Sequence, residues 1–417
     1  HAFERREGAA IDATSALAAD ATWSAGVGLA LVDPATALVF QARHLRLALD
    51  SGDPARVARA YAMEASLVAT AGVATTERIA SLVNEARALA TDTNDVRAHV
   101  WIKAAESTAS FMRGRWREAL ERCDETESFA RAQCADVAWE VEAMRIFALS
   151  SLDFLGDIAA LRARVPAMLA DGKARGDRFG VVHARIGHAT VAWLAADDPE
   201  GARREVHAAM AALDDRGSSA LGEHGHARGM RSARVQDYYA VVSRAQIGLY
   251  SGRPDYALAV IDEWWRAIES AMLLRVEPLR IVLRSLRARA ALASAVTAPA
   301  DRRAALLSIA SRDARVLESE AAPWAQPMAM LLRAGEAALG GANEIARDQL
   351  ARAIPAFEEH DMALHALVAR LAVSRFEGAL GARVARRLVQ KIRGKGVDAP
   401  WTYAAMMAPG LVAADST

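Results

Sequence analysis

Cysteine is almost absent from this chain, which has only Cys123 and Cys134 among its 417 residues. The two lie eleven positions apart and form no CxxC pair, so no disulfide framework is indicated. We interpret both as small buried residues in a reducing compartment, which predicts a cytoplasmic location.

An excess of charge of either sign is also absent. The chain has 51 Lys and Arg residues against 51 Asp and Glu residues, and its pI is near 7.3. Because nucleic-acid-binding proteins usually carry a basic excess, we expect no general affinity for DNA or RNA.

A clean apolar run of membrane-spanning length is missing as well. The best candidate, residues 13–32, is interrupted by Asp20, loosened by Gly26 and Gly28, and lacks the cationic start of a signal peptide. We therefore interpret this run as a buried helical hairpin and expect no membrane partner.

Helix-forming residues are what the chain has in abundance. Alanine, leucine, arginine and glutamate dominate, while glycine and proline number only 26 and 12, and runs of β-branched residues between tight turns do not occur. This composition predicts an all-α fold. With 417 residues the chain is too long for one ordinary core, so we expect several domains or a repeat array.

The segment FMRGRWREALERCDE, residues 111–125, shows the unit that repeats. An apolar helix end meets Gly114, a residue suited to the left-handed corner at a helix C-terminus. In the helix that follows, Trp116, Ala119, Leu120 and Cys123 recur at helical spacing and predict one buried face. The segment therefore predicts a helical hairpin.

Corners of this kind recur along the chain at a regular interval. From corner to corner the spacing is 42 residues three times, then 54, 47, 42 and 40 residues. Such a period is typical of stacked hairpins, each of which buries its apolar face against its neighbours. We predict an α-solenoid of about nine stacked antiparallel helical hairpins, tetratricopeptide-like, with a period of about 42 residues. The corners lie at Gly72, Gly114, Gly156, Asp198, Gly252 and Gly341, and near Pro299 and Gly381.

The same pattern predicts how the chain is divided. The predicted segments are an N-terminal helical segment (1–34), helical repeats (35–216), an insertion loop (217–235), further helical repeats (236–396) and a C-terminal tail (397–417). The insertion has four glycines and little apolar periodicity. A loop of this kind is either a binding element or a plain variation in length.

Six blocks of sequence together resemble a known family. They resemble the tetratricopeptide-like C-terminal region of large bacterial serine/threonine protein kinases, in which a kinase domain, often followed by an AAA-type ATPase module, precedes the helical repeats. The period is nearer 42 than 34 residues, so the repeats are tetratricopeptide-like rather than tetratricopeptide repeats. The blocks are WSAGVGLALVD (23–33), FQARHLRLALDSGDPARVARAYAMEA (40–65), GRWREALERC (114–123), CADVAWEVEAMRIFAL (134–149), LLRVEPLRIVLRSLRARAAL (273–292) and APWTYAAMMAPG (399–410).

Catalytic motifs of that family do not occur in this chain. It has no glycine-rich loop with a downstream catalytic lysine, no HRD, no DFG and no GxxxxGK[ST] phosphate loop. The resemblance therefore implies the non-catalytic arm of such a kinase. We expect no enzyme activity and no cofactor.

Three arginines form the first candidate binding site. Arg280, Arg284 and Arg287 lie at i, i+4 and i+7 of one predicted helix, where a stripe of guanidinium groups would bind carboxylates or phosphorylated segments. The alternative is a solvated face, or pairing with acids of the next hairpin such as Glu318 and Glu320.

Aromatic residues near the middle corners form the second candidate. Such side chains dominate binding energies when they line a groove, but they also fill hairpin cores. Trp264 and Trp265 are adjacent, so we expect one of them to be buried and the other partly exposed. The other candidates are Trp193, Tyr238, Tyr239 and Tyr250, of which Trp193, Tyr238 and Tyr239 are the predicted binding residues.

Histidine pairs give only a weak indication of a metal site. His224 and His226, beside Glu223, have a metal-like spacing, but no third and fourth ligand follows at a recognisable interval, so we expect no metal. Two further pairs are five apart and lack HExxH, which favours satisfied or solvent-facing histidines. They are His183 with His188 and His360 with His365.

These features predict a binding module rather than an enzyme. The first hypothesis is a scaffold that binds a protein or peptide and serves as the regulatory arm of a bacterial signalling kinase. The alternative is a repeat arm that senses a small molecule, as in ATP-dependent signalling regulators. A self-assembling structural role is also open, because solenoid ends can stack. An enzyme is disfavoured because no nucleophile, base and orienting group lie at neighbouring motif positions. The partner's identity and the oligomeric state are not fixed by the sequence.

Overall fold

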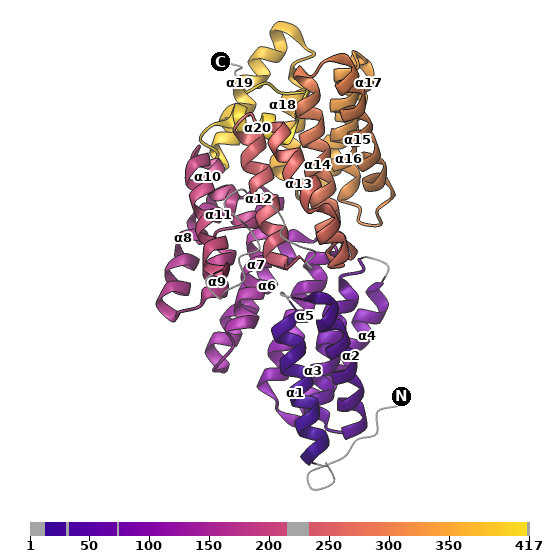
Figure 1. Cartoon of the computed structure of the whole chain (residues 1–417), viewed down its shortest axis with the longest axis vertical. Coiled ribbons are helices and arrows are strands. Elements are labelled where there is room, and N and C mark those ends of the chain that lie inside the picture. Colours follow the sequence, from indigo (N-terminus) through magenta and orange to yellow (C-terminus); the bar gives the residue numbers. More distant parts are fainter. Residues whose placement is uncertain (1–12, 31–32, 73–74, 215–232, 415–417) are drawn as a thin grey trace. The chain divides into compact units, whose positions relative to one another are not determined.

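The computed structural model describes residues 13–30, 33–72, 75–214 and 233–414 (Figure 1). Within these ranges all regular structure is helical and no strand occurs, which confirms the all-α prediction. The first helices are α1 (Ala13–Leu29), α2 (Pro34–Ser51), α3 (Pro54–Ala69), α4 (Thr76–Thr93), α5 (Val96–Met112), α6 (Trp116–Gln133) and α7 (Ala138–Leu155). The next are α8 (Ile158–Arg175), α9 (Arg178–His183), the 3₁₀ helix η3 (Gly187–Thr190), α10 (Val191–Ala195), α11 (Pro199–Asp214), α12 (Val235–Tyr250) and α13 (Pro254–Ser270). The last are η4 (Leu273–Arg275), α14 (Glu277–Thr297), α15 (Ala300–Ser319), α16 (Ala325–Leu339), α17 (Asn343–Glu359), α18 (Ala363–Ser374), α19 (Gly378–Gly394) and α20 (Pro400–Met407).

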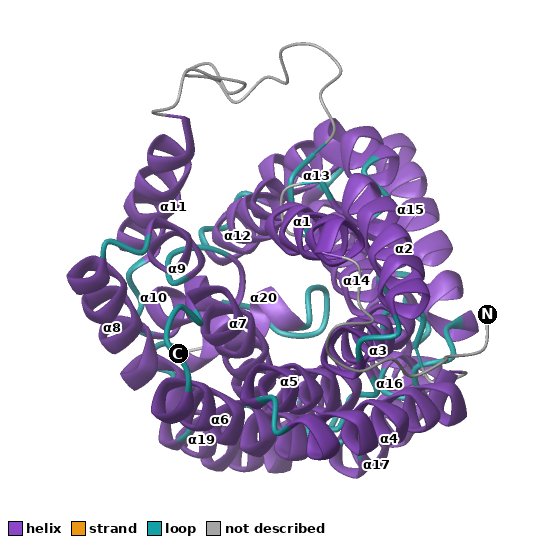
Figure 2. Cartoon of the chain, turned by 90° about the horizontal axis from the view of Figure 1, so that it is seen from below, coloured by secondary structure: helices purple, strands orange, loops and turns teal. Residues whose placement is uncertain are grey.

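The chain divides into two compact units. The described residues of unit 1 lie within 13–148, 233–236 and 267–277, and those of unit 2 lie within 149–214, 237–266 and 278–414. In both units consecutive helices pack as hairpins joined by short loops (Figure 2), for example α1 with α2 and α5 with α6 in unit 1, and α16 with α17 in unit 2. The chain is therefore a helical-repeat protein.

Aspartate begins several of these helices. The carboxylates of Asp33, Asp53, Asp95 and Asp157 each accept a hydrogen bond from a backbone N–H in the first turn of the helix that follows. Such caps satisfy amide groups that the helix itself leaves without a partner. Asp33 and Asp53 are each followed by proline, which is accommodated at the first helical position.

The predicted corners hold for most of the chain. Gly114 and Gly156 have φ angles of 73° and 69°, so each ends its helix in the left-handed conformation that a Cβ disfavours. In the helix after Gly114 the side chains of Trp116 and Cys123 are buried as predicted. The expected single-glycine corner at Gly114 is thus the turn between α5 and α6.

The corner predicted near Gly381 lies a few residues before this glycine. The turn lies between the end of α18 at Ser374 and the start of α19 at Gly378, and Gly381 falls inside α19. A Cβ on Gly381 would lie 1.8 Å from the Ser374 carbonyl oxygen. Glycine is therefore needed at this position for a close backbone approach rather than for a turn.

The apolar run at residues 13–32 was expected to form a hairpin by itself, and this prediction is wrong. Its described part contains one continuous helix, α1, whose hairpin partner is α2. Gly26 lies against α2, where a Cβ would be 3.6 Å from the Phe40 Cβ atom, so it marks a helix contact and not a break. None of the helices in the described ranges has the length and apolarity needed to cross a membrane.

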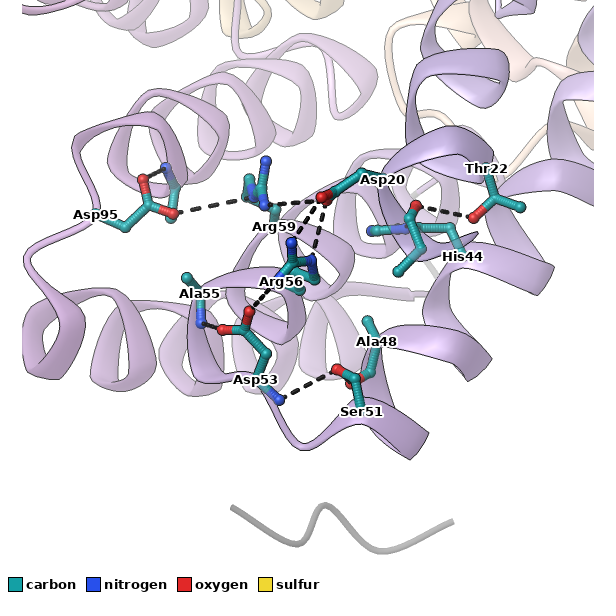
Figure 3. A network of polar contacts seen from close by, with 12 residues as sticks. Asp20, Thr22, His44, Ala48, Ser51, Asp53, Ala55, Arg56, Arg59 and Asp95 are labelled. Carbon is teal, nitrogen blue, oxygen red and sulfur yellow. Dashed lines mark hydrogen bonds and ion pairs between the residues drawn. The ribbon is translucent and has the colours of Figure 1, made fainter. Parts of the chain in front are cut away.

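Ion pairs connect the first hairpins of unit 1 (Figure 3). Arg56 on α3 donates to both carboxylate oxygens of Asp20 on α1, at 3.0 and 2.6 Å, and also pairs with the cap residue Asp53. Arg59, one turn further along α3, lies between Asp20 and the α5 cap Asp95. These guanidinium groups connect α3 to the middle of α1 and to the N-cap of α5.

The C-terminal segment, predicted as a tail, contains α20 and packs into unit 2. The backbone N–H of Asp398 donates to the Ala195 carbonyl oxygen at 2.7 Å, and Arg162 donates to both carboxylate oxygens of Asp398. At the other end, Arg375 donates to the carbonyl oxygen of Gly410 at 2.5 Å. Helix α20 also contacts α18 and α19.

Candidate functional site

The arginine stripe lies on α14 of unit 2, and all three of its side chains have carboxylate partners. Arg280 donates to the two carboxylate oxygens of Glu320 at 2.6 and 2.5 Å. Arg284 and Arg287 both donate to Asp313, at 2.6 and 3.3 Å, and Arg287 also donates to Asp262 at 2.7 Å. Three acids therefore offset the charge of the three arginines.

The aromatic pair beside the stripe divides as predicted. Trp264 is buried, whereas Trp265 is half-buried and lies under the guanidinium groups of Arg284 and Arg287, at 5.1 and 5.0 Å. Cation–π contacts and ion pairs thus hold the same two arginines. The arginines of the stripe thus pair with acids of neighbouring helices, which was the alternative to a binding surface. Glu320 is one of these acids, as that alternative expected.

The remaining predicted binding residues lie mostly inside unit 2. Tyr238 is 1% exposed, and its hydroxyl donates to the Leu279 carbonyl oxygen at 2.9 Å. Tyr239 packs against Gly187, where an added Cβ would lie 2.6 Å from the ring. Burial raises the pKa of both phenols above the usual value. Trp193 on α10 is half-buried.

A groove on unit 2 lies between α11, α12 and α13. Its volume is about 450 Å³. The apolar and aromatic side chains that line it come from all three helices and are Val206, Ile247, Tyr256, Ala259, Val260 and Trp264. Trp264 was among the aromatic residues singled out from the sequence, and the structure places it at this groove.

Polar groups of both signs also line this groove. They are Arg203 and His207 on α11, Arg244 on α12 and Glu263 on α13. Arg203 pairs with Glu200, whereas Arg244 has no hydrogen bond or ion pair with any residue that the structure describes. The groove therefore combines apolar contact area with a guanidinium group that has no carboxylate partner in this part of the chain.

A second polar cluster lies in the interior of unit 2. It consists of Asp153 on α7, His188 on η3, Arg289 on α14, His365 on α18 and Tyr403 on α20. His188 Nδ1 lies 2.7 Å from the Asp153 Oδ2 atom, and their side chains are 13% and 18% exposed. Asp153 acts electrostatically on Arg289, His365 and Tyr403. Arg289 in turn acts electrostatically on His365 and Tyr403.

Burial controls the ionisation of this cluster. It lowers the pKa of Arg289 to about 10, although Asp153 and Tyr403 act in the opposite direction. It also lowers the pKa of His365 to about 4, so that this imidazole is neutral near pH 7. It raises the pKa of Tyr403 well above the usual value. Arg289 is thus the one cation among these three groups at neutral pH.

Close backbone approaches bring the contributing helices together. At the turn after α7, a Cβ on Gly156 would lie 2.4 Å from the Leu364 Cβ atom at the start of α18. This contact explains how Asp153 comes near His365. On α16, a Cβ on Gly335 would lie 2.9 Å from the Pro409 carbonyl oxygen and 3.2 Å from Leu292 of α14, so the segment after α20 and α14 meet there.

Sequence reasoning missed most of this cluster. His188 and His365 were each considered with a histidine five positions away, whereas their actual polar neighbours lie on other helices. Arg289 and Tyr403 fall in the blocks 273–292 and 399–410 that carry the family resemblance, and no spacing singles them out. His224 and His226 lie outside the described residues. Among those residues, no group of three or more His, Cys, Asp and Glu side chains is arranged to hold a metal ion.

Comparison with known protein families and with curated proteins found no match for this chain.

Proposed function

We propose that this chain is a non-catalytic binding module whose groove between α11 and α13 holds an acidic segment of a partner protein or a peptide. The observation that carries the proposal is Arg244. It lines a groove of about 450 Å³ and has no hydrogen bond or ion pair with the described residues. A carboxylate supplied by a ligand would satisfy the donors of this guanidinium group.

The rest of the groove fits the same kind of ligand. Val206, Val260 and Trp264 offer apolar contact for the side chains that flank an acidic residue. Arg203 and His207 add basic groups, whereas Glu263 is the one acid among the lining residues. Apolar area with a few polar groups is typical of ligand sites, and Trp and Arg are frequent among residues that dominate binding energies.

In this account the chain is the regulatory arm of a bacterial signalling serine/threonine kinase. Support for this part comes from the resemblance of blocks such as 23–33 and 114–123. The coding sequence around this region tests it: a kinase domain in the same reading frame would support the link, and a complete gene without one would contradict it.

The peptide proposal is tested with a synthetic library. Hexapeptides with a fixed central Glu, phosphoserine or Gln and random apolar flanks are immobilised and probed with the purified chain. We expect binding to the Glu and phosphoserine sets and at least tenfold less to the neutral Gln set, because a charged hydrogen bond contributes about 1.5–3 kcal/mol. Equal binding of all three sets would contradict the proposal.

A small-molecule sensor is the second candidate function. It is favoured by a different observation, the cluster of buried polar groups around Arg289 in unit 2.

A further inference from the structure

Arg289 differs from the other arginines of its helix. Arg280, Arg284 and Arg287 all have carboxylate partners on α14's neighbours. Arg289 has no hydrogen bond and no ion pair with any described residue, and its Nε atom is buried without a partner. The Arg289 side chain as a whole is half-buried. A cation withdrawn from water without a contacting anion is unfavourable, so proteins normally pair such a group.

The acid nearest to this cation is already engaged. Asp153 acts electrostatically on Arg289, but the Asp153 carboxylate is hydrogen-bonded to His188 at 2.7 Å and does not contact the guanidinium group. Asp153 therefore moderates the charge of Arg289 from a distance without using its N–H donors. The N–H donors of Arg289 therefore remain available to an acceptor supplied by a ligand.

Two further polar groups beside Arg289 also lack partners. The Nδ1 atom of His365 is buried without a hydrogen bond. Tyr403 is only 2% exposed, and its hydroxyl makes no hydrogen bond within the described ranges. A neutral imidazole can donate one N–H and a phenol can donate its O–H. Both groups feel the electrostatic effect of Arg289, so the three together offer a guanidinium group, an imidazole and a phenol as donors to an oxyanion.

The three groups come from helices far apart in sequence that are held firmly in unit 2. Tyr403 lies on α20, which the contacts of Asp398 with Arg162 and with the Ala195 backbone fix at its start. His365 lies beside Leu364, which packs against the turn at Gly156. The arrangement is therefore preformed and does not depend on a loop.

We propose that Arg289, Tyr403 and His365 form a buried binding site in unit 2 for the carboxylate or phosphate group of a small molecule. Carboxylate and phosphate both carry two anionic oxygens on one central atom, which an arginine fork binds with two parallel hydrogen bonds. None of these three residues lines the groove at Arg244, so the two sites are distinct. The buried site goes beyond the proposed peptide-binding function and does not depend on it.

The experiment uses the purified whole chain and two probes, inorganic phosphate and acetate, with sodium chloride at equal ionic strength as the reference. Binding is measured by isothermal titration calorimetry, and the thermal unfolding temperature is measured with and without each probe. We expect saturable binding of at least one probe. Arg289→Gln should weaken it at least tenfold, and Tyr403→Phe, which keeps the ring, should weaken it several-fold. Arg383→Gln, which removes an exposed charge of unit 2, should leave it unchanged.

A second variant separates a ligand site from a structural charge. Without added anion, Arg289→Met should unfold at the same or a higher temperature than the parent chain, because it removes a buried charge that has no contacting partner. No saturable binding of either probe, or equal binding by Arg289→Gln, would overturn the proposal. A lower unfolding temperature for Arg289→Met would also overturn it, because Arg289 would then be a structural charge balanced by Asp153. The Arg244→Gln variant should still bind the anion, so failure of the groove proposal and failure of this one are distinguishable.

Discussion

Arg280 and Glu320 form a bidentate ion pair that joins α14 to the residue directly after α15. The two hydrogen bonds measure 2.6 and 2.5 Å, and the Glu320 side chain is only 7% exposed. The stripe of arginines that the sequence suggests as a binding surface is therefore a row of ion pairs that joins α14 to its neighbouring helices. We call this row of ion pairs the seam. Among the described residues Arg244 and Arg289 lack such partners, and the two proposed sites for acidic ligands are built on them.

The first prediction concerns the centre of this seam. Asp313 is fully buried and accepts hydrogen bonds from both Arg284 and Arg287. Asp313→Asn should destabilise the chain by about 3 kcal/mol, because breaking a buried pair from one side leaves the other charge uncompensated. Urea unfolding, monitored by circular dichroism, measures this loss of stability.

The matched control for this prediction is Asp262→Asn. Asp262 also pairs with Arg287 but is 42% exposed, so its loss should cost less than about 1 kcal/mol. Equal losses for the two variants would show that Asp313 does not hold the seam.

The second prediction concerns the turn at Gly156. This residue has a φ angle of 69° and touches Leu364, whereas Gly176 has a similar φ angle of 65° and open space around it. Both changes to alanine should cost about 1 kcal/mol for the left-handed backbone. Gly156→Ala should cost a further 1–3 kcal/mol, on the order expected for overpacking. Similar unfolding free energies for the two variants would contradict the contact between this turn and α18.

The third prediction is a pH dependence in unit 1. His44 is 1% exposed and its Nδ1–H donates to the Ala19 carbonyl oxygen, while burial lowers the pKa of His44 to about 4. In the unfolded chain the pKa is about 6.5, so below that pH the unfolded state binds a proton that the native state does not. The contribution of His44 to stability is therefore complete above about pH 6.5 and is lost as the pH falls toward 4.

Comparison of the parent chain with His44→Asn tests this dependence, since the asparagine amide can still donate to Ala19. Between about pH 7.5 and pH 5 the parent should lose about 2 kcal/mol more than the variant. Identical losses, measured by urea unfolding at both pH values, would show that His44 does not control the acid sensitivity.

The fourth prediction concerns the ion pairs of α3 in Figure 3. Arg56→Gln should destabilise unit 1 by about 1 kcal/mol, a modest value because the Asp20 side chain is 44% exposed. Arg46→Gln breaks a pair with Asp50 in which both side chains are more than half exposed, so it should change stability by less than about 0.5 kcal/mol. The thermal unfolding temperatures of the two variants rank these effects, and a larger drop for Arg46→Gln would contradict the account.

The hairpins were predictable from the sequence because their causes are local. A left-handed glycine such as Gly114 and an apolar face such as that of Trp116 lie within a few residues of the turn they specify. The corner predicted near Gly381 is displaced by a few residues, because a helix contact and a corner both require glycine and the sequence does not separate the two. The difference is seen only once the Ser374 carbonyl is placed 1.8 Å from the missing Cβ atom.

The candidate sites were not predictable in the same way. Arg289 and Tyr403 are more than a hundred residues apart and come close enough to interact electrostatically only because α14 and α20 belong to one unit. The sequence singled out Arg280, Arg284 and Arg287 by their spacing and gave no reason to consider Arg244. Whether an arginine has a carboxylate partner depends on the acids of the helix that packs against it. The spacing of residues along one helix does not predict which acids those are.

Titration of one acidic hexapeptide from the library against matched variants tests the central claim most directly. Arg244→Gln removes the groove cation, and Arg266→Gln removes an exposed charge of α13 that does not line the groove. The account predicts that Arg244→Gln weakens binding at least tenfold, by about 1.5–3 kcal/mol, while Arg266→Gln binds like the parent. Equal affinity of all three proteins would contradict the claim that this groove binds acidic segments.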